Sequence, residues 1–107
     1  MHILMVKDTI MRRHATLVID RKLNLDDGFI LQAVVWELPI PLPGSRHRFK
    51  YRLFYGRAGE CLVRFDNERG KGDHKHTGNN EYPYRFVDLP TLLRDFYSEV
   101  DQIGGSK

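Results

Sequence analysis

Four short runs of strand-forming residues, separated by turn signals, constrain the fold of this chain more than any other feature. Residues 16–23 alternate apolar and polar side chains, which is the pattern of a strand with one buried face. Residues 29–38 are apolar on both faces, so we expect this strand at the centre of the sheet. Two further strands are predicted over residues 49–55 and 61–66. Together the four runs predict an antiparallel meander.

Glycine and proline mark the connections between these runs. Gly28 follows two aspartates, and glycine supplies the positive φ of a tight hairpin. Three prolines after Leu38 end the second strand, because proline has no N–H to donate to a ladder. We therefore expect an extended loop there, and the next turn at Gly56–Gly59.

One amphipathic helix is expected over residues 87–103, with Asp88 as its N-cap and Pro90 in its first turn. Its apolar stripe consists of Leu89, Leu92, Leu93, Phe96, Val100 and Ile103. Residues 1–107 are thus expected to form a single α+β domain. It is a four- to five-stranded antiparallel meander sheet with the C-terminal helix packed on one face. Residues 1–10 fit helix or strand equally well, and residues 104–107 are expected to be a disordered tail.

The alternation of the fourth strand divides its side chains between two faces. Cys61, Val63 and Phe65 are expected to face the core under the helix, and Arg64 and Asp66 to face away. Same-face neighbours on adjacent strands lie about 5 Å apart, which places Lys50 and Arg52 near Arg64. The sequence therefore predicts an open, basic sheet face suited to an anionic partner. Trp36, in the apolar second run, is expected in the core.

The composition excludes several classes of protein. A single cysteine rules out a disulfide within the chain and a cysteine-based zinc site. No apolar run approaches the roughly 18 residues of a transmembrane helix, so no membrane partner is expected. The N-terminus lacks the order of a signal peptide, and we therefore expect a cytoplasmic location.

Residues 64–78 carry the side chains best suited to chemistry, and we expect residues 67–81 to form a loop that leaves the open face. His74 and His76 are two residues apart and can give and take protons near pH 7. With Asp66 or Asp73 they would form an acid/base catalytic set. The same four residues would alternatively form a divalent-metal site, or the histidines are incidental to a mobile polar loop.

Basic residues around this segment are candidates for binding phosphate. They are Arg64, Arg69, Lys71, Lys75, Lys50 and Arg52. Gly70-Lys71-Gly72 resembles the start of a phosphate-binding loop. It is not a Walker A motif, because the required spacing and the strand–loop–helix context are both missing. ATP hydrolysis is therefore not expected, and no cofactor is implied.

The segment Asp66-Asn67-Glu68-Arg69-Gly70-Lys71-Gly72-Asp73-His74-Lys75-His76, with Leu25-Asp26-Asp27-Gly28 before it and Tyr82-Pro83-Tyr84 after it, resembles the TumE family. These proteins are toxin components of bacterial type II toxin–antitoxin pairs. The resemblance runs from about Thr16 to Val100. It implies a growth-inhibiting activity and a cognate antitoxin with a helix-turn-helix DNA-binding domain. Analogy with other small α+β toxins makes an RNA endonuclease the expected activity.

Three functional hypotheses follow from the residues and the resemblance. The first is RNA cleavage without metal, with His74 and His76 as the acid/base pair in either order. The second is a metal-dependent nuclease, and the third is a non-catalytic module that binds RNA or the antitoxin through its basic face. Neither the target RNA nor the oligomeric state follows from the sequence.

Overall fold

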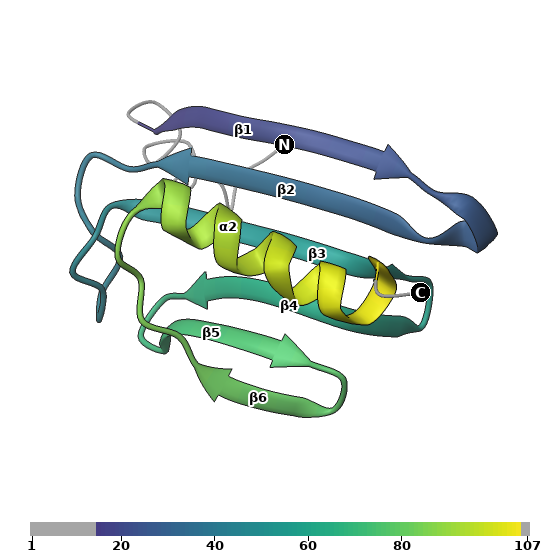
Figure 1. Cartoon of the computed structure of the whole chain (residues 1–107). Helices are drawn as coiled ribbons and strands as arrows, with labels where there is room; N and C mark the ends of the chain where they lie inside the picture. Colours follow the sequence, from purple (N-terminus) through teal and green to yellow (C-terminus); the bar gives the residue numbers. More distant parts are fainter. Residues whose placement is uncertain (1–14, 106–107) are drawn as a thin grey trace.

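The protein is an open six-stranded antiparallel sheet with one helix lying across a single face (Figure 1). The computed structural model describes residues 15–105, and the strands follow one another in the sheet in chain order. They are β1 (Thr16–Asn24), β2 (Ile30–Glu37), β3 (Phe49–Arg57), β4 (Glu60–Glu68), β5 (Gly72–Thr77) and β6 (Asn80–Pro83). The predicted α+β meander is confirmed, with six strands in place of four to five.

The additional strands come from the segment that was expected to be a loop. β4 continues to Glu68, and a three-residue turn leads into β5. Gly70 and Gly72 have φ values of 79° and 81°, so these glycines supply the backbone that the turn requires. A two-residue turn at residues 78–79 then joins β5 to β6. The expectation of a loop over residues 67–81 was therefore wrong.

Helix α2 (Leu89–Val100) begins where the sequence predicts. The Asp88 side chain accepts a hydrogen bond from the Thr91 backbone N–H at 2.8 Å, which confirms Asp88 as the N-cap. Leu92 and Phe96 are fully buried against the sheet. The chain continues into η2 (Asp101–Gly105), a π-helical turn, and η1 (Asp26–Gly28) is a short 3₁₀ turn between β1 and β2.

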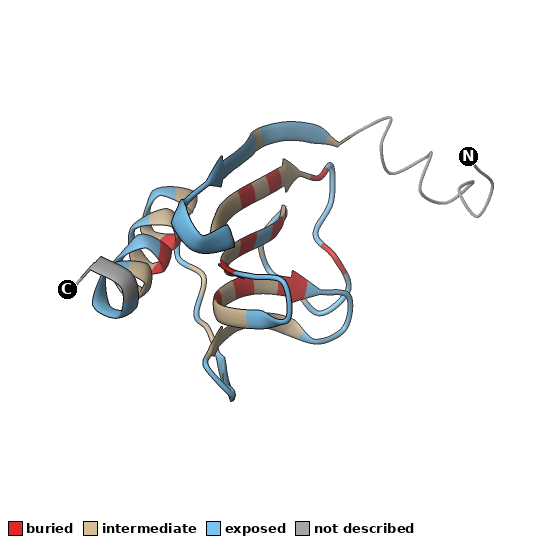
Figure 2. Cartoon of the chain, turned by 90° about the vertical axis from the view of Figure 1, so that its right-hand side faces the viewer, coloured by how far each residue is buried: buried red, intermediate tan, exposed pale blue. Residues whose placement is uncertain are grey.

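The hydrophobic core lies between α2 and the sheet face that it covers, where buried residues form red bands in Figure 2. Phe65 of β4 meets Phe96 of α2 edge to face, with ring centroids 5.7 Å apart. The other buried members of the core are Ala33, Val35, Tyr51, Leu53, Val63 and Leu92. The opposite face of the sheet carries no helix in the part of the chain from residue 15 to residue 105.

Two residues expected in the core lie on the open face instead. A register shift between β3 and β4 pairs Val63 with Tyr55 but Cys61 with Gly56, so Leu62 rather than Cys61 packs against the core. Burial raises the pKa of the Cys61 thiol, while the charges of Arg64 and Arg52 act to lower it. Trp36 pairs with Lys50 on the open face and is half-buried there.

The proline-rich connection between β2 and β3 packs onto the β4–β5 turn. Leu42 is buried, and the Gly70 N–H donates a hydrogen bond of 2.8 Å to the Pro43 carbonyl. Gly44 has a φ of 88°, and a Cβ atom there would lie 3.4 Å from the Gly70 Cα. The connection therefore holds the turn that precedes β5 in place.

The two ends of the chain lie partly outside this description. Residues 1–10, left open between helix and strand, fall outside the described residues. Of the expected tail at residues 104–107, Gly104 and Gly105 belong to η2, and the last two residues are not described. None of the helices within residues 15–105 has the length and apolar character that a bilayer crossing requires.

Candidate active site on the open face of the sheet

His74 and His76 lie side by side on the open face of the sheet, because alternate residues of β5 share a face. The register pairs Asp66 with His74 and Arg64 with His76 across β4 and β5. The structure therefore brings four of the predicted site residues into one cluster. We call Arg64, Asp66, His74, His76 and the neighbouring Glu81 the histidine cluster.

Glu81 is the carboxylate closest to the two imidazoles. It lies on β6 opposite His76, and its Oε2 is 3.5 Å from Nδ1 of His74 and 3.8 Å from Nε2 of His76. The sequence analysis missed this residue. A signal was present, since Gly78-Asn79 is a dipeptide typical of two-residue hairpins and predicts the pairing of His76 with Glu81.

Arg64 joins the other side of the cluster. Its NH2 group donates a hydrogen bond of 2.8 Å to Nε2 of His76, and its Nε lies 3.2 Å from Oδ2 of Asp66. Because arginine has only donors, Nε2 of His76 is the acceptor in this hydrogen bond. Asp66 therefore orients Arg64 and has no hydrogen bond to an imidazole among the described residues.

Two polar atoms of the cluster are buried without a hydrogen bond among residues 15–105. They are Nε of Arg64 and Nε2 of His74. The 3.2 Å approach of Arg64 to Asp66 is an ion pair whose angle does not satisfy a hydrogen bond. Buried polar atoms of this kind are costly, so proteins retain them chiefly where they have a role.

Asp73 and Lys75 lie on the opposite face of β5, under the helix. Oδ2 of Asp73 accepts hydrogen bonds from the Tyr51 hydroxyl at 2.6 Å and from Nε2 of His47 at 2.8 Å. Lys75 pairs with Glu99 of α2 at 2.7 Å. Neither residue faces the histidine cluster, so Asp73 cannot orient His74 or His76 in this arrangement.

His47 has both of its ring nitrogens engaged, which marks it as a residue that fixes structure. The Phe49 N–H donates to Nδ1 at 3.1 Å, so Nε2 carries the proton that is donated to Asp73. The ring also stacks on Phe86, with centroids 3.8 Å apart. Burial, followed by the hydrogen bond to Asp73, raises the pKa of Tyr51 far above its usual value.

Asn67 continues the β3–β4 ladder with its side chain. It is only 1% exposed, accepts a hydrogen bond from the Tyr51 N–H at 3.0 Å and donates one of 2.6 Å to the Phe49 carbonyl. The structure shows that its amide satisfies two backbone groups of β3.

The candidate phosphate-binding residues occupy three different places: the open face, the β4–β5 turn and the helix side of the sheet, where Lys75 lies. Arg52 and Lys50 lie on the open face beside the histidine cluster, and Lys50 donates to the Asn67 carbonyl at 3.1 Å. Arg69 and Lys71 lie in the exposed β4–β5 turn, where Lys71 is 3.5 Å from Glu68. Glu81 adds a negative charge that was not expected on the open face, which is therefore less basic than the sequence suggests.

The described residues contain no group of three or more His, Cys, Asp or Glu side chains arranged to hold a metal ion. The four residues considered as metal ligands are divided between two faces, because Asp73 points to the helix side. This donor set does not fit a divalent ion in the arrangement observed.

A sequence model of the family described as toxin TumE matches residues 5–103, nearly the whole chain. The chain belongs to the TumE toxin family. Membership supports a toxin role and, in general terms, an antitoxin partner. Searches of curated proteins and of solved structures gave no match.

In this TumE protein the run from Asp66 to His76 spans the end of β4, the following turn and β5. The pleat separates its residues by role. Asn67 and Asp73 hydrogen-bond to groups of β3 on the helix side, and Asp66, His74 and His76 lie in the histidine cluster. One short motif thus supplies both structural contacts and candidate chemistry.

Proposed function

We propose that this TumE toxin is an RNA endonuclease that cleaves without a metal ion, using the histidine cluster for acid/base catalysis. The observation that carries the proposal is the position of Glu81, whose Oε2 lies within 3.8 Å of ring nitrogens of both His74 and His76. Two imidazoles on one carboxylate, beside an arginine, form a set that moves protons next to a phosphate.

In the proposed reaction the ribose 2′-oxygen attacks the adjacent phosphorus and the bond to the 5′-oxygen breaks. His76 takes the proton of the 2′-OH, and His74 gives a proton to the departing 5′-oxygen. The products are a 2′,3′-cyclic phosphate and a 5′-hydroxyl. General acid/base help of this kind contributes about 10²–10⁴-fold.

In this proposal Arg64 links the binding of substrate to the availability of Nε2 of His76 as a proton acceptor. In the free protein its guanidinium occupies the lone pair on Nε2 of His76. A phosphate bound beside Arg64 competes for that guanidinium, since Arg–phosphate pairs are charge-assisted and often bidentate. Movement of Arg64 onto the phosphate frees Nε2 to accept a proton and places positive charge where it develops in the transition state.

The two histidines are assigned unequal roles because their exposure differs. The side chain of His76 is 22% exposed and that of His74 12%, with Nε2 of His74 fully shielded. His76 is therefore the imidazole that meets the 2′-OH. Nδ1 of His74, which faces Glu81 at 3.5 Å, is the nitrogen assigned to the transfer of a proton to the 5′-oxygen, since Nε2 is buried.

The test is expression from an inducible promoter of the parent chain beside His74→Ala/His76→Ala, with growth and total RNA followed together. Arg57→Ala serves as the control, because it removes a cation at the β3–β4 turn, away from the cluster. Growth arrest with RNA breakdown in the parent and the control only would support the proposal. A folded double variant that still degrades RNA would refute the assignment.

Metal-dependent cleavage and non-catalytic binding predict different outcomes. Cleavage by purified protein that survives EDTA and needs no added Mg²⁺ or Mn²⁺ removes the first alternative. If the protein is a non-catalytic binding module, removal of Lys50, Arg52 and Arg64 lowers its affinity for RNA and makes that affinity less dependent on salt concentration. Loss of both histidines then has little effect on RNA affinity at pH 8.

The antitoxin is proposed to be a helix-turn-helix DNA-binding protein with an acidic segment that covers the open face. RNA as substrate and a DNA-binding partner would both place the toxin in the cytoplasm. A purified complex in which residues 64–78 remain open to solvent would contradict this mode of inhibition.

A further inference from the structure

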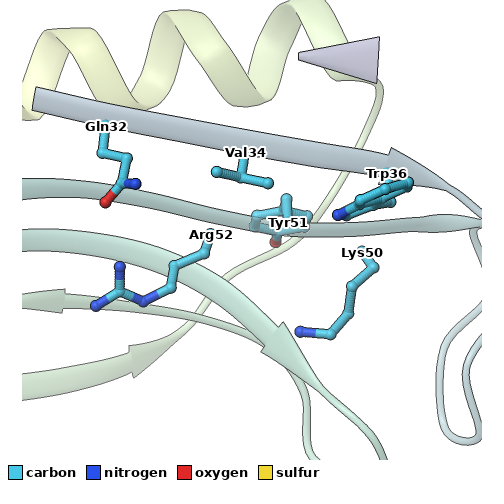
Figure 3. A pocket seen from close by; sticks show the side chains of 6 residues that line it. All are labelled: Gln32, Val34, Trp36, Lys50, Tyr51 and Arg52. Carbon is cyan, nitrogen blue, oxygen red and sulfur yellow. The ribbon is translucent and has the colours of Figure 1, made fainter. Parts of the chain in front are cut away.

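A hollow of about 340 Å³ opens between β2 and β3 on the open face (Figure 3). Its volume is at the small end of the range for sites that bind small molecules. The lining residues are Gln32, Val34, Trp36, Lys50, Tyr51 and Arg52. None of the side chains of the histidine cluster takes part in it.

The hollow combines three kinds of group that recognise an unpaired nucleobase. Trp36 offers an indole ring, on which bases stack through their π-faces. The Gln32 amide has no hydrogen-bond partner among residues 15–105, and it points into the hollow in Figure 3. An amide carries two donors and one acceptor oxygen, which match the mixed donor and acceptor edge of a base. Arg52 adds a cation next to the amide.

The hollow is in register with the histidine cluster. Arg52 pairs with Val34 on one side and with Asp66 on the other, and Asp66 pairs with His74. Neighbouring strands lie about 4.8 Å apart, so β3 and β5 are about 10 Å apart along the sheet. A strand of RNA that enters the hollow therefore passes Arg52 and Arg64 before it reaches the histidines.

Gln32 and Trp36 are four residues apart on β2, about 13 Å along the strand. We propose that the hollow is a subsite for two neighbouring unpaired nucleotides of the RNA strand, one with its base stacked on Trp36 and the other with its polar edge on Gln32 and its phosphate near Arg52. This rests on the proposed function and adds to it that the substrate is single-stranded where it binds. The cations alone would suit an acidic peptide equally well. The indole and the amide without a partner favour a planar, polar ligand such as a base.

The chain offers a direct reporter, because Trp36 is its only tryptophan. The experiment titrates the protein with a short single-stranded RNA that carries 2′-O-methyl groups and cannot be cleaved. Tryptophan fluorescence is followed, and anisotropy of a label on the RNA gives affinity. Expected results are quenching by this RNA and none by an abasic oligomer of equal length or by duplex RNA.

Two substitutions at Trp36 separate the effect of ring stacking from that of an apolar side chain. Trp36→Leu keeps an apolar side chain but removes the ring, and affinity is expected to fall roughly tenfold or more. Trp36→Phe keeps a ring and should retain most of the affinity. Equal affinity of the Leu variant and the parent would overturn the subsite, as would quenching by the abasic oligomer or by an acidic peptide alone.

The subsite and the proposed function can fail separately. Quenching and base-dependent binding by a protein that never cleaves unmodified RNA would retain the subsite and refute the nuclease. Cleavage of unmodified RNA that is unchanged in kcat/KM by Trp36→Leu would retain the nuclease and refute the subsite. Binding is measured with RNA that lacks the 2′-OH, so it does not depend on the chemistry.

Discussion

The Tyr51 hydroxyl donates a hydrogen bond of 2.6 Å to the Asp73 carboxylate across the width of β4. Tyr51 belongs to β3 and Asp73 to β5, and the β4 residue between them is Asn67. The tyrosine ring therefore lies over Asn67, which explains why an amide is buried there. This row of side chains links β3, β4 and β5 on the helix side of the sheet.

Asp73→Ala is expected to lower the free energy of unfolding by about 2–4 kcal/mol. The substitution leaves the Tyr51 hydroxyl and Nε2 of His47 without an acceptor, and each unsatisfied buried donor costs about 1–3 kcal/mol. Urea denaturation measures the change. Asp73→Asn is the matched control, since its amide oxygen still accepts and the loss should be smaller. Full stability with lost toxicity would move Asp73 into the reaction.

Asn67→Ala is expected to destabilise the protein by a similar amount, about 2–4 kcal/mol, because two backbone groups of β3 lose their partner. Amide hydrogen exchange gives a specific readout, since the Tyr51 N–H should exchange faster. Asn67→Asp keeps the acceptor for that N–H and loses the donor to the Phe49 carbonyl. If the Tyr51 N–H exchanges equally slowly in the Ala variant, its hydrogen bond to the Asn67 side chain is not what protects it from exchange.

Alkaline pH is expected to destabilise the fold through Tyr51. Burial and Asp73 raise the pKa of its hydroxyl in the folded state, so the unfolded chain loses this proton first. The stabilisation is complete below the unfolded pKa of about 10 and is lost as pH rises towards the folded value. Tyr84, whose pKa is raised by burial and by Asp95, acts in the same direction.

The urea midpoint between about pH 8 and pH 11 tests this dependence. Tyr51→Phe should begin with lower stability and lose less of it as the pH rises. Parallel curves for the variant and the parent would assign the alkaline loss to other groups.

His76→Ala is expected to lower the rate of RNA cleavage by about 10²–10⁴-fold, because the proton acceptor is removed. Glu81→Gln should cause a smaller loss and shift the pH–rate profile, since this carboxylate contacts both rings. Initial rates on a labelled RNA give both numbers. Lys75→Gln is the control on the opposite face of β5. If the control lost as much activity as His76→Ala, the open face would not be the reactive one.

Most of the fold was readable from the sequence because its signals are local. The period-two alternation of residues 16–23, the turn at Gly28 and the Asp88 cap each act over a few residues. The hairpin of β5 and β6 was only partly predicted, by the optional fifth strand, because the glycines at 70 and 72 were interpreted as a ligand loop. Those glycines instead supply the positive φ of a hairpin turn.

The site was less readable because it depends on register. The spacing of His74 and His76 predicts a shared face, but nothing local shows that Asp73 reaches Tyr51 or that Glu81 reaches the histidines. Cys61 shows the same limit, since one extra residue in β4 moves its side chain to the other face. Trp36 was placed in the core because an apolar strand was assumed to be covered on both sides.

The alternation of side chains along β5 predicts how substitutions in this strand affect toxicity and protein abundance. In a scan of every substitution across Gly72–Thr77, toxicity would be lost at Asp73, His74 and His76. Cellular abundance of the protein would fall at Asp73 and be maintained at His74 and His76, with a period of two residues. The two phenotypes, plotted along six codons, would report the orientation of a strand without any structural measurement.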